Sequence, residues 1–229
     1  MKRILMYCTS LLFLLIFPLA LKAQKKVTDI DGNVYRTVKI GTQIWMAENL
    51  KTTKYRNGEP IPNVINNAQW ASSNTGAYCW YNNNSANKST YGALYNWYAV
   101  SDIRNIAPVG WHVATDADWT ILTIFLNGEG VAGGKLKESG TAHWKDPNQG
   151  ATNNNGFTAL PGGGRVEKSK FDYMGLNGAW WAYSVVPRRG EFNIGSTSEW
   201  NRYISYISPS IYRVNINKHY GYSVRCILD

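Results

Sequence analysis

The chain has 229 residues, with 24 Lys and Arg against 15 Asp and Glu, so its formal net charge is +9. The basic residues are scattered along the sequence, whereas a nucleic-acid-binding protein usually gathers them on one face. We therefore expect no nucleic-acid partner, and the length suits one domain.

The first 23 residues have the pattern of a secretory signal peptide. Lys2 and Arg3 precede the apolar run Leu11–Phe17, and Ala23 supplies a small residue before the cut. A retained anchor is the alternative, but the run is shorter than the roughly 20 residues of a bilayer span. Cleavage removes three basic residues and lowers the net charge from +9 to +6. The prediction is a secreted or cell-surface protein, or a periplasmic one, with no transmembrane segment after cleavage.

The first predicted element of the mature chain is a β-hairpin over residues 34–46. Val34, Val38 and Ile40 share one face of its first strand. Gly41-Thr42 suits a two-residue loop that begins with glycine.

Two helices are predicted next. Residues 91–100 carry apolar side chains at helical spacing. A better-marked helix follows Thr115, which suits an N-cap because Asp118 stands three residues later, and it ends at Asn127-Gly128.

Beyond the second helix the sequence is rich in loops. It holds short apolar pieces at Lys135–Lys137, Phe157–Pro161 and Ala179–Val186, and the glycine run Gly162–Gly164 reads as a turn. Short strands with long irregular connections, after two helices, predict a single α+β domain over residues 24–229.

Residues 221–229 alternate like a strand, so we expect a terminal strand within the core sheet. Cys226 lies in this strand, and Cys79 is the other cysteine after cleavage. An even pair in an oxidising compartment predicts one disulfide between them. Two buried free thiols are the alternative, because two cysteines carry no spacing pattern.

Six blocks of sequence follow one another in a characteristic order. They are Asp29–Tyr35 with Ile40–Leu50, then Tyr91–Trp97, Ala107–Val113, Thr115–Trp119, Gly156–Gly163 and Ser223–Cys226. Together they resemble the Fibrobacter succinogenes major paralogous domain family over essentially the whole mature chain. Ala114 departs from the pattern, where the family has proline.

The resemblance implies secretion by bacteria whose surfaces carry many such paralogues. It also implies a C-type-lectin-like fold, with two helices, short twisted antiparallel strands and long irregular loops, similar to formylglycine-generating enzymes and phage receptor-binding proteins. It implies no catalytic mechanism, and a fold alone does not give a function.

The sequence shows no catalytic constellation. Asp116 and Asp118 are explained by their place at a helix N-terminus, where acidic side chains stabilise the helix. No Gly-x-Ser-x-Gly elbow accompanies His112. An enzyme therefore remains only the alternative to a binding protein.

No metal site or cofactor is predicted either. Asp29, Asp31 and Asn33 alternate like the start of a calcium loop, but the closing glutamate is missing, so a turn leading into the hairpin is favoured. No cysteine or histidine spacing suits zinc. Structural calcium held by loop oxygens stays open as an alternative.

The candidate binding surface is the aromatic segment Gly178–Tyr220. Tyrosine, tryptophan, arginine and asparagine are favoured at binding surfaces, and in the resembled fold the loops before the terminal strand carry recognition. Packing of these aromatics in the core is the alternative. The expected ligand-binding residues are Trp181, Tyr183, Trp200, Asn201, Arg202, Tyr203 and Tyr206, with residues 200–203 at the centre.

We therefore predict a secreted, non-enzymatic binding or adhesion module that recognises an extracellular polysaccharide or surface protein. The alternatives are an extracellular glycan-modifying hydrolase and a structural surface protein without a discrete ligand. Carboxylates in a deep cleft would favour the enzyme, and an aromatic shelf would favour binding.

Overall fold

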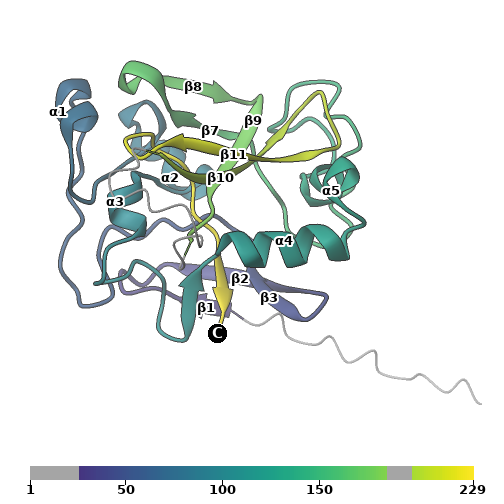
Figure 1. Cartoon of the computed structure of the whole chain (residues 1–229), viewed down its shortest axis with the longest axis horizontal. Coiled ribbons are helices and arrows are strands. Elements are labelled where there is room, and N and C mark those ends of the chain that lie inside the picture. The colour runs from purple at the N-terminus through teal and green to yellow at the C-terminus, as the bar shows by residue number, and fades with distance from the viewer. Residues whose placement is uncertain (1–25, 185–197) are drawn as a thin grey trace, which may run out of the picture.

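The computed structural model describes residues 26–184 and 198–229, which build an α+β fold on a five-stranded antiparallel sheet. Its strands stand in the order β1 (Lys26–Thr28), β2 (Val34–Ile40), β3 (Gln43–Met46), β12 (Cys226–Leu228) and β6 (Trp111–Val113). The end of the chain therefore lies between two much earlier strands (Figure 1). The prediction of a terminal strand inside the core sheet is confirmed.

The predicted hairpin is also confirmed, because β2 and β3 pair with Val38 opposite Trp45. Gly41 opens the turn at a φ of 61°, and a Cβ at this position would lie 2.9 Å from the Phe125 ring. Glycine is thus required both by the turn and by the close packing. The lead-in turn is present as well, since Asp29 Oδ1 accepts hydrogen bonds from backbone amides two and four residues later.

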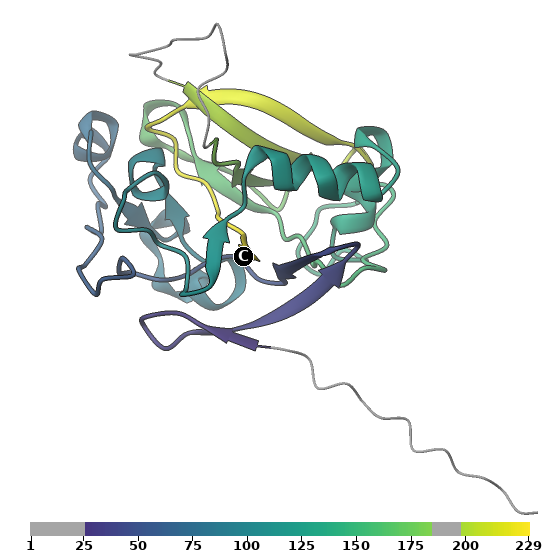
Figure 2. The same cartoon turned by 60° about the horizontal axis from the view of Figure 1, so that its bottom comes forward.

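A second, three-stranded sheet has the order β11 (Ile211–Asn217), β10 (Ser198–Ser205) and β9 (Asn177–Trp181). Helix α4 (Asp116–Phe125) lies between this sheet and the β2–β3 hairpin in both views (Figures 1 and 2). Two strand pairs complete the described structure: β4 (Tyr78–Cys79) with β5 (Leu94–Tyr95), and β7 (Gly162–Arg165) with β8 (Phe171–Met174).

Helix α4 begins as predicted. The Thr115 hydroxyl accepts from the Asp118 amide at 3.1 Å, and the Asp118 carboxylate accepts from the Thr115 amide at 2.8 Å, which makes a capping box. The other helices are α1 (Asn67–Ser72), α2 (Lys88–Tyr91), α3 (Trp97–Val100) and α5 (Glu129–Leu136), with 3₁₀ turns at Tyr81–Asn83, Ser85–Asn87 and Glu167–Ser169.

The helix predicted over residues 91–100 is wrong. Leu94 and Tyr95 form β5 by pairing with Cys79 and Tyr78 of β4, and the Tyr95 backbone also exchanges hydrogen bonds with Tyr222. Asn96 then caps the short helix α3, since its Oδ1 accepts from the Ala99 amide at 3.0 Å. Pairing with a distant part of the chain thus overrides a local helical pattern.

Two glycine-rich segments also differ from the predictions. The apolar piece at residues 135–137 forms the C-terminal end of helix α5. Within the same helix, a Cβ on Gly133 would lie 2.2 Å from the Ser210 carbonyl oxygen. The expected turn at residues 162–164 is strand β7, where a Cβ on Gly164 would lie 2.5 Å from the Tyr222 ring. Both segments use glycine because another part of the chain approaches their backbone closely.

The core contains a cluster of large aromatic rings between the two sheets. Trp45 and Trp119 have ring centroids 5.0 Å apart, and Phe157 and Trp180 join them at 5.6–6.4 Å. Tilted and edge-to-face pairs at these distances add stabilisation beyond the burial of apolar area.

Arg225 forms a buried hub next to this cluster. Its guanidinium donates to Asn49 Oδ1 at 2.8 Å, to the Met46 carbonyl at 2.8 Å, and to the Phe157 and Thr158 carbonyls at 3.0 Å. Burial lowers the pKa of Arg225 to about 9. The hub joins three segments that are far apart in the sequence.

No helix in the two described ranges is long and apolar enough to cross a membrane. The predicted signal peptide, residues 1–23, lies outside these ranges, so its cleavage stays a prediction.

We expect Arg225→Ala to lower the free energy of unfolding by about 3 kcal/mol or more, because several buried acceptors lose their donor. Arg36→Ala is the matched control, since Arg36 is half exposed in its ion pair with Glu48 and its loss should cost less than about 1 kcal/mol. Urea denaturation measures both values. Equal effects of the two variants would contradict the role of the hub.

Two alanine substitutions within α5 should have opposite effects on stability. Gly133→Ala is destabilising because its Cβ would meet the backbone of Ser210. Gly130→Ala meets nothing within 4 Å and should stabilise the helix by up to about 1 kcal/mol. Thermal unfolding of the two variants tests this, and destabilisation by Gly130→Ala would count against the assigned helix.

Candidate functional site

The predicted disulfide between Cys79 and Cys226 is wrong, because both side chains are buried free thiols. Cys79 packs with Trp70 and Leu94, whereas Cys226 belongs to the separate cluster around Trp181. Burial raises the pKa of Cys79 to about 12 and that of Cys226 further still. Tertiary packing keeps the two thiols in different parts of the core.

We expect neither thiol of the protein comprising residues 24–229 to react with an alkylating reagent in the native state. After unfolding in urea without a reductant, both should react, since the reactive thiolate then becomes accessible. Mass spectrometry counts the adducts. If neither cysteine reacted in the unfolded chain, the result would contradict the free thiols and support a disulfide between them.

The predicted binding surface is divided by strand alternation. Residues 200–203 lie in β10, where successive side chains point to opposite faces of the sheet. Asn201 and Tyr203 line a pocket on one face, while Trp200 and Arg202 belong to the other. One ligand therefore cannot contact all four side chains on the same face.

Arg202 holds the three-stranded sheet against α4. Its side chain is 1% exposed and pairs with Asp116 at 2.9 Å and with Glu129 at 3.2 Å. Arg213 also binds Asp116, at 2.7 Å, and its guanidinium lies 3.5 Å from the centroid of the Trp200 ring. Burial tends to raise the pKa of Asp116, but the two arginines outweigh it and lower that pKa. These ion pairs give Asp116 a structural role, so no catalytic role is needed to explain its position.

The remaining predicted residues lie elsewhere. Trp181 is fully buried and its indole N–H donates to the Tyr95 carbonyl, so Trp181 and Arg202 are core residues, not parts of an exposed surface. Tyr183 stacks on Trp97 with ring centroids 5.6 Å apart, and Tyr206 packs on the cluster beside α4. Of the seven predicted residues, only Asn201 and Tyr203 line the pocket described next.

We call this cavity the tyrosine pocket. It has a volume of about 410 Å³, within the range of small-molecule sites, and lies between the free face of the three-stranded sheet and the β7–β8 hairpin. Apolar residues of β9 and β11 form part of its lining, including Ala179, Val214 and Ile216. Its larger and polar side chains are Tyr173, Tyr203, Tyr220, Tyr222, Glu167, Asn177 and Asn201.

Asn201 provides the most informative atom of the pocket. The residue is 1% exposed, and its Nδ2 has no hydrogen-bond acceptor among the described residues. A buried donor without a partner costs about 1–3 kcal/mol. An acceptor from a ligand or from an ordered water in the pocket would satisfy this donor.

The hydroxyl groups and the carboxylate of the pocket are also free of protein partners. Neither the Glu167 carboxylate nor any of the four tyrosine hydroxyls makes a hydrogen bond to the protein within residues 26–184 and 198–229. Burial raises the pKa of Tyr220, and the negative charges of Glu167 and of ionised Tyr173 raise it further. These groups all line the tyrosine pocket, and they remain available to a ligand.

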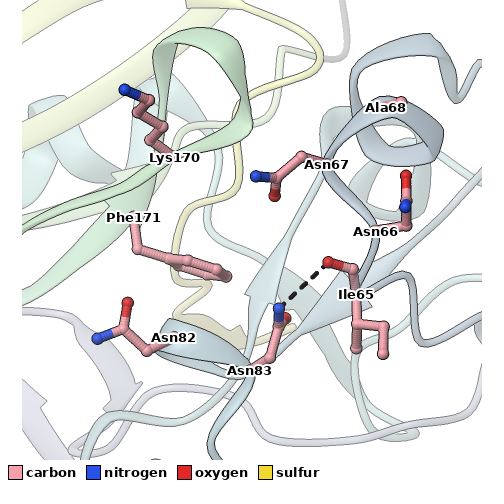
Figure 3. Close-up of a pocket in the computed structure, with 8 residues that line it drawn as sticks. All are labelled: Ile65, Asn66, Asn67, Ala68, Asn82, Asn83, Lys170 and Phe171. Atoms are coloured by element: carbon pink, nitrogen blue, oxygen red, sulfur yellow. Dashed lines mark hydrogen bonds between the residues drawn. The ribbon is translucent and has the colours of Figure 1, made fainter.

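A larger groove, of about 770 Å³, lies between α1 and the start of β8 (Figure 3). Its asparagines already stabilise the fold. Asn66 caps α1 by accepting from the Gln69 amide, Asn67 Oδ1 accepts from Arg165 at 2.7 Å, and Asn83 donates to the Ile65 carbonyl at 3.1 Å. The tyrosine pocket is therefore the better candidate site.

His112 is not placed to activate a nucleophile. Its Nδ1 lies 2.7 Å from Asp229 Oδ1 and its Nε2 lies 3.0 Å from Asp118 Oδ2, so carboxylates occupy both ring nitrogens. The hydrogen bond to Asp118 is the main cause that raises the pKa of His112. In the described ranges, no group of three or more His, Cys, Asp or Glu side chains is placed to hold a metal ion.

A family model for the Fibrobacter succinogenes major domain matches residues 38–228. The chain belongs to this family. No curated protein and no solved structure matches the chain. In this Fibrobacter succinogenes major domain, three of the blocks that carry the resemblance meet at one point, because Arg225 binds Asn49 and the Phe157 carbonyl.

Among the polar and aromatic lining residues, Glu167, Tyr173, Asn177 and Tyr222 lie outside the predicted segment, and Tyr220 ends that segment without being among the seven expected residues. Tyr222 was available as part of the terminal strand pattern, and the alternation within residues 200–203 could have separated Asn201 and Tyr203 from their neighbours. Glu167 and Tyr173 had no local signal, because only the packing of the β7–β8 hairpin brings them to the sheet.

Proposed function

We propose that this member of the family is a secreted, non-enzymatic binding module whose tyrosine pocket holds a sugar unit of an extracellular polysaccharide. The observation that carries the proposal is the unpartnered Nδ2 of Asn201 in a pocket with four tyrosines. The apolar C–H faces of sugar rings stack on aromatic side chains, and their oxygens accept hydrogen bonds from amides.

The shape and composition of the pocket support a sugar better than a large apolar ligand. Tyr220 and Tyr222 have ring centroids 6.1 Å apart and an angle of 66° between their planes. Tyr222 is buried and Tyr220 is half-buried, so Tyr220 offers the more accessible aromatic surface. Asn177 and Glu167 add hydrogen-bonding groups at the rim and wall. A sugar unit matches this mixture, since it has apolar faces and a ring of hydroxyl groups.

We also propose the C-type-lectin-like architecture that the resemblance implies. Its support is the terminal strand β12 within the main sheet and the long irregular connections between short strands. Export rests on the charged, apolar and small residues of the segment 1–23. Mass spectrometry of the mature protein checks export, and an intact Met1 would contradict it.

A screen of the protein comprising residues 24–229 against an array of extracellular glycans tests the function. We expect binding to at least one oligosaccharide, and we expect Asn201→Ala and Tyr220→Ala each to weaken it by roughly tenfold or more. Asn201→Ala should keep its stability, because the deleted amide nitrogen has no protein partner.

Tyr98→Ala is the matched control, since Tyr98 is a half-buried tyrosine outside the pocket. It should leave the glycan affinity unchanged. Binding that survives both pocket variants would place the site elsewhere. Absence of binding to any glycan, with capture of a surface protein instead, would replace the polysaccharide by a protein ligand.

A further inference from the structure

We propose that the tyrosine pocket selects a sugar unit with a free, protonated amine over neutral, N-acetylated and acidic units. This inference rests on the proposed function and adds the chemical class of the ligand. It follows from the charge lining the pocket and from the aromatic faces that are left without a cation.

The first argument is the sign of the charge. The protein is basic, but Glu167 is the only charged side chain among the described residues that line the pocket. Cations nearby are directed away or neutralised. Lys170 lines the separate groove next to α1, Arg213 binds Asp116 on the other face of the sheet, and Lys218 pairs with Glu199 at 3.4 Å.

Two further cations flank pocket residues within the described part of the chain. Arg165 donates to the Val64 and Ile65 carbonyls, away from the pocket, and the other cation is Lys168. It stands next to Glu167 in the chain, is exposed to solvent and does not line the pocket. Glu167 is exposed as well, but its carboxylate is the charge that lines the pocket, and charges in solvent are screened over about 8 Å at physiological ionic strength. An acidic sugar bound in the pocket lies nearest to this carboxylate and would meet repulsion there.

The second argument comes from the aromatic rings. Elsewhere in this protein, aromatic faces commonly receive a cation: Arg104 lies 3.9 Å from the Tyr55 centroid, Arg225 lies 4.4 Å from that of Phe157, and Lys145 lies 5.5 Å from that of Tyr206. Within the described ranges, no cation lies over any of the four pocket tyrosines. Aromatic faces beside a carboxylate are a suitable environment for an ammonium group.

An amino sugar satisfies the free groups of the pocket together. Its C–H face stacks on Tyr220 or Tyr222, its ammonium pairs with Glu167, and one of its oxygens accepts from Asn201 Nδ2. A neutral sugar leaves Glu167 without a charged partner. An N-acetylated sugar has lost the positive charge, so it gains neither the ion pair nor the cation–π interaction.

Calorimetric titration of the protein comprising residues 24–229 with three β-1,4-linked oligosaccharides of equal length tests this. Their units are glucosamine, N-acetylglucosamine and glucose. At a pH where the amine is protonated, we expect the glucosamine oligomer to bind about tenfold more tightly than the other two. The preference should shrink at high salt and when the amine is deprotonated.

Glu167→Gln should abolish this preference, so that the glucosamine and glucose oligomers bind the variant with similar affinity. The matched control is Glu59→Gln, which changes the net charge equally but lies in an exposed ion pair outside the pocket. The preference should survive in this control. Loss of preference in both variants would assign the effect to the overall charge and overturn the inference.

Equal binding of all three oligosaccharides, weakened by Asn201→Ala, would overturn the amine selectivity while the proposed function stands. Absence of binding to all three and to the wider glycan array would overturn the proposed function itself. Tetramethylammonium is included as a probe of charge alone. If it binds in the pocket and no oligosaccharide does, the ligand is a cation of another class and the amino-sugar proposal is wrong.

Discussion

The buried guanidinium of Arg225 joins the parts of this domain that its sequence keeps far apart. Among the described residues, no carboxylate is hydrogen-bonded to it, and backbone carbonyls and Asn49 hold it. Asn49 in turn accepts from the Trp180 indole at 2.8 Å and donates to the Ser223 hydroxyl at 3.2 Å. A planar donor with five N–H groups suits this task, because it satisfies several carbonyls that irregular segments leave unpaired.

This hub also explains how a domain with short strands and long connections stays ordered. Regular ladders satisfy only part of its backbone, so side chains take over the remaining acceptors. The buried indoles of Trp70, Trp144 and Trp181 each donate to a carbonyl of a distant residue. Lys137 does the same with three carbonyls, and burial lowers its pKa to about 8. Many aromatic and basic side chains of this domain therefore stabilise its interior by donating to backbone carbonyls.

The two faces of the three-stranded sheet have different surroundings. One face is fixed to α4 through Arg202, Arg213 and Asp116, which gives the sheet a rigid support. The opposite face carries Asn201 and Tyr203 toward the tyrosine pocket. A binding site on a sheet that is held from behind is better preorganised than one on a free loop, and preorganisation lowers the entropy cost of binding.

The sequence by itself determined the features whose causes are local. The capping box at Thr115 and Asp118, the glycine-first turn at Gly41 and the terminal strand each depend on neighbouring residues or on a period of two. The ordered blocks were sufficient to identify the family, and three of them contain the residues that meet at Arg225.

Only the tertiary structure decided the features that depend on distant partners. Pairing with Tyr78 and Tyr222 places Tyr95 in a strand, Ser210 explains a glycine inside α5, and packing leaves Cys79 and Cys226 in different clusters. The tyrosine pocket belongs to this group, since its lining comes from the β7–β8 hairpin, all three strands of the sheet and the segment before β12. Composition indicated an aromatic binding region, but the face that each side chain occupies follows from strand pairing, which local sequence does not specify.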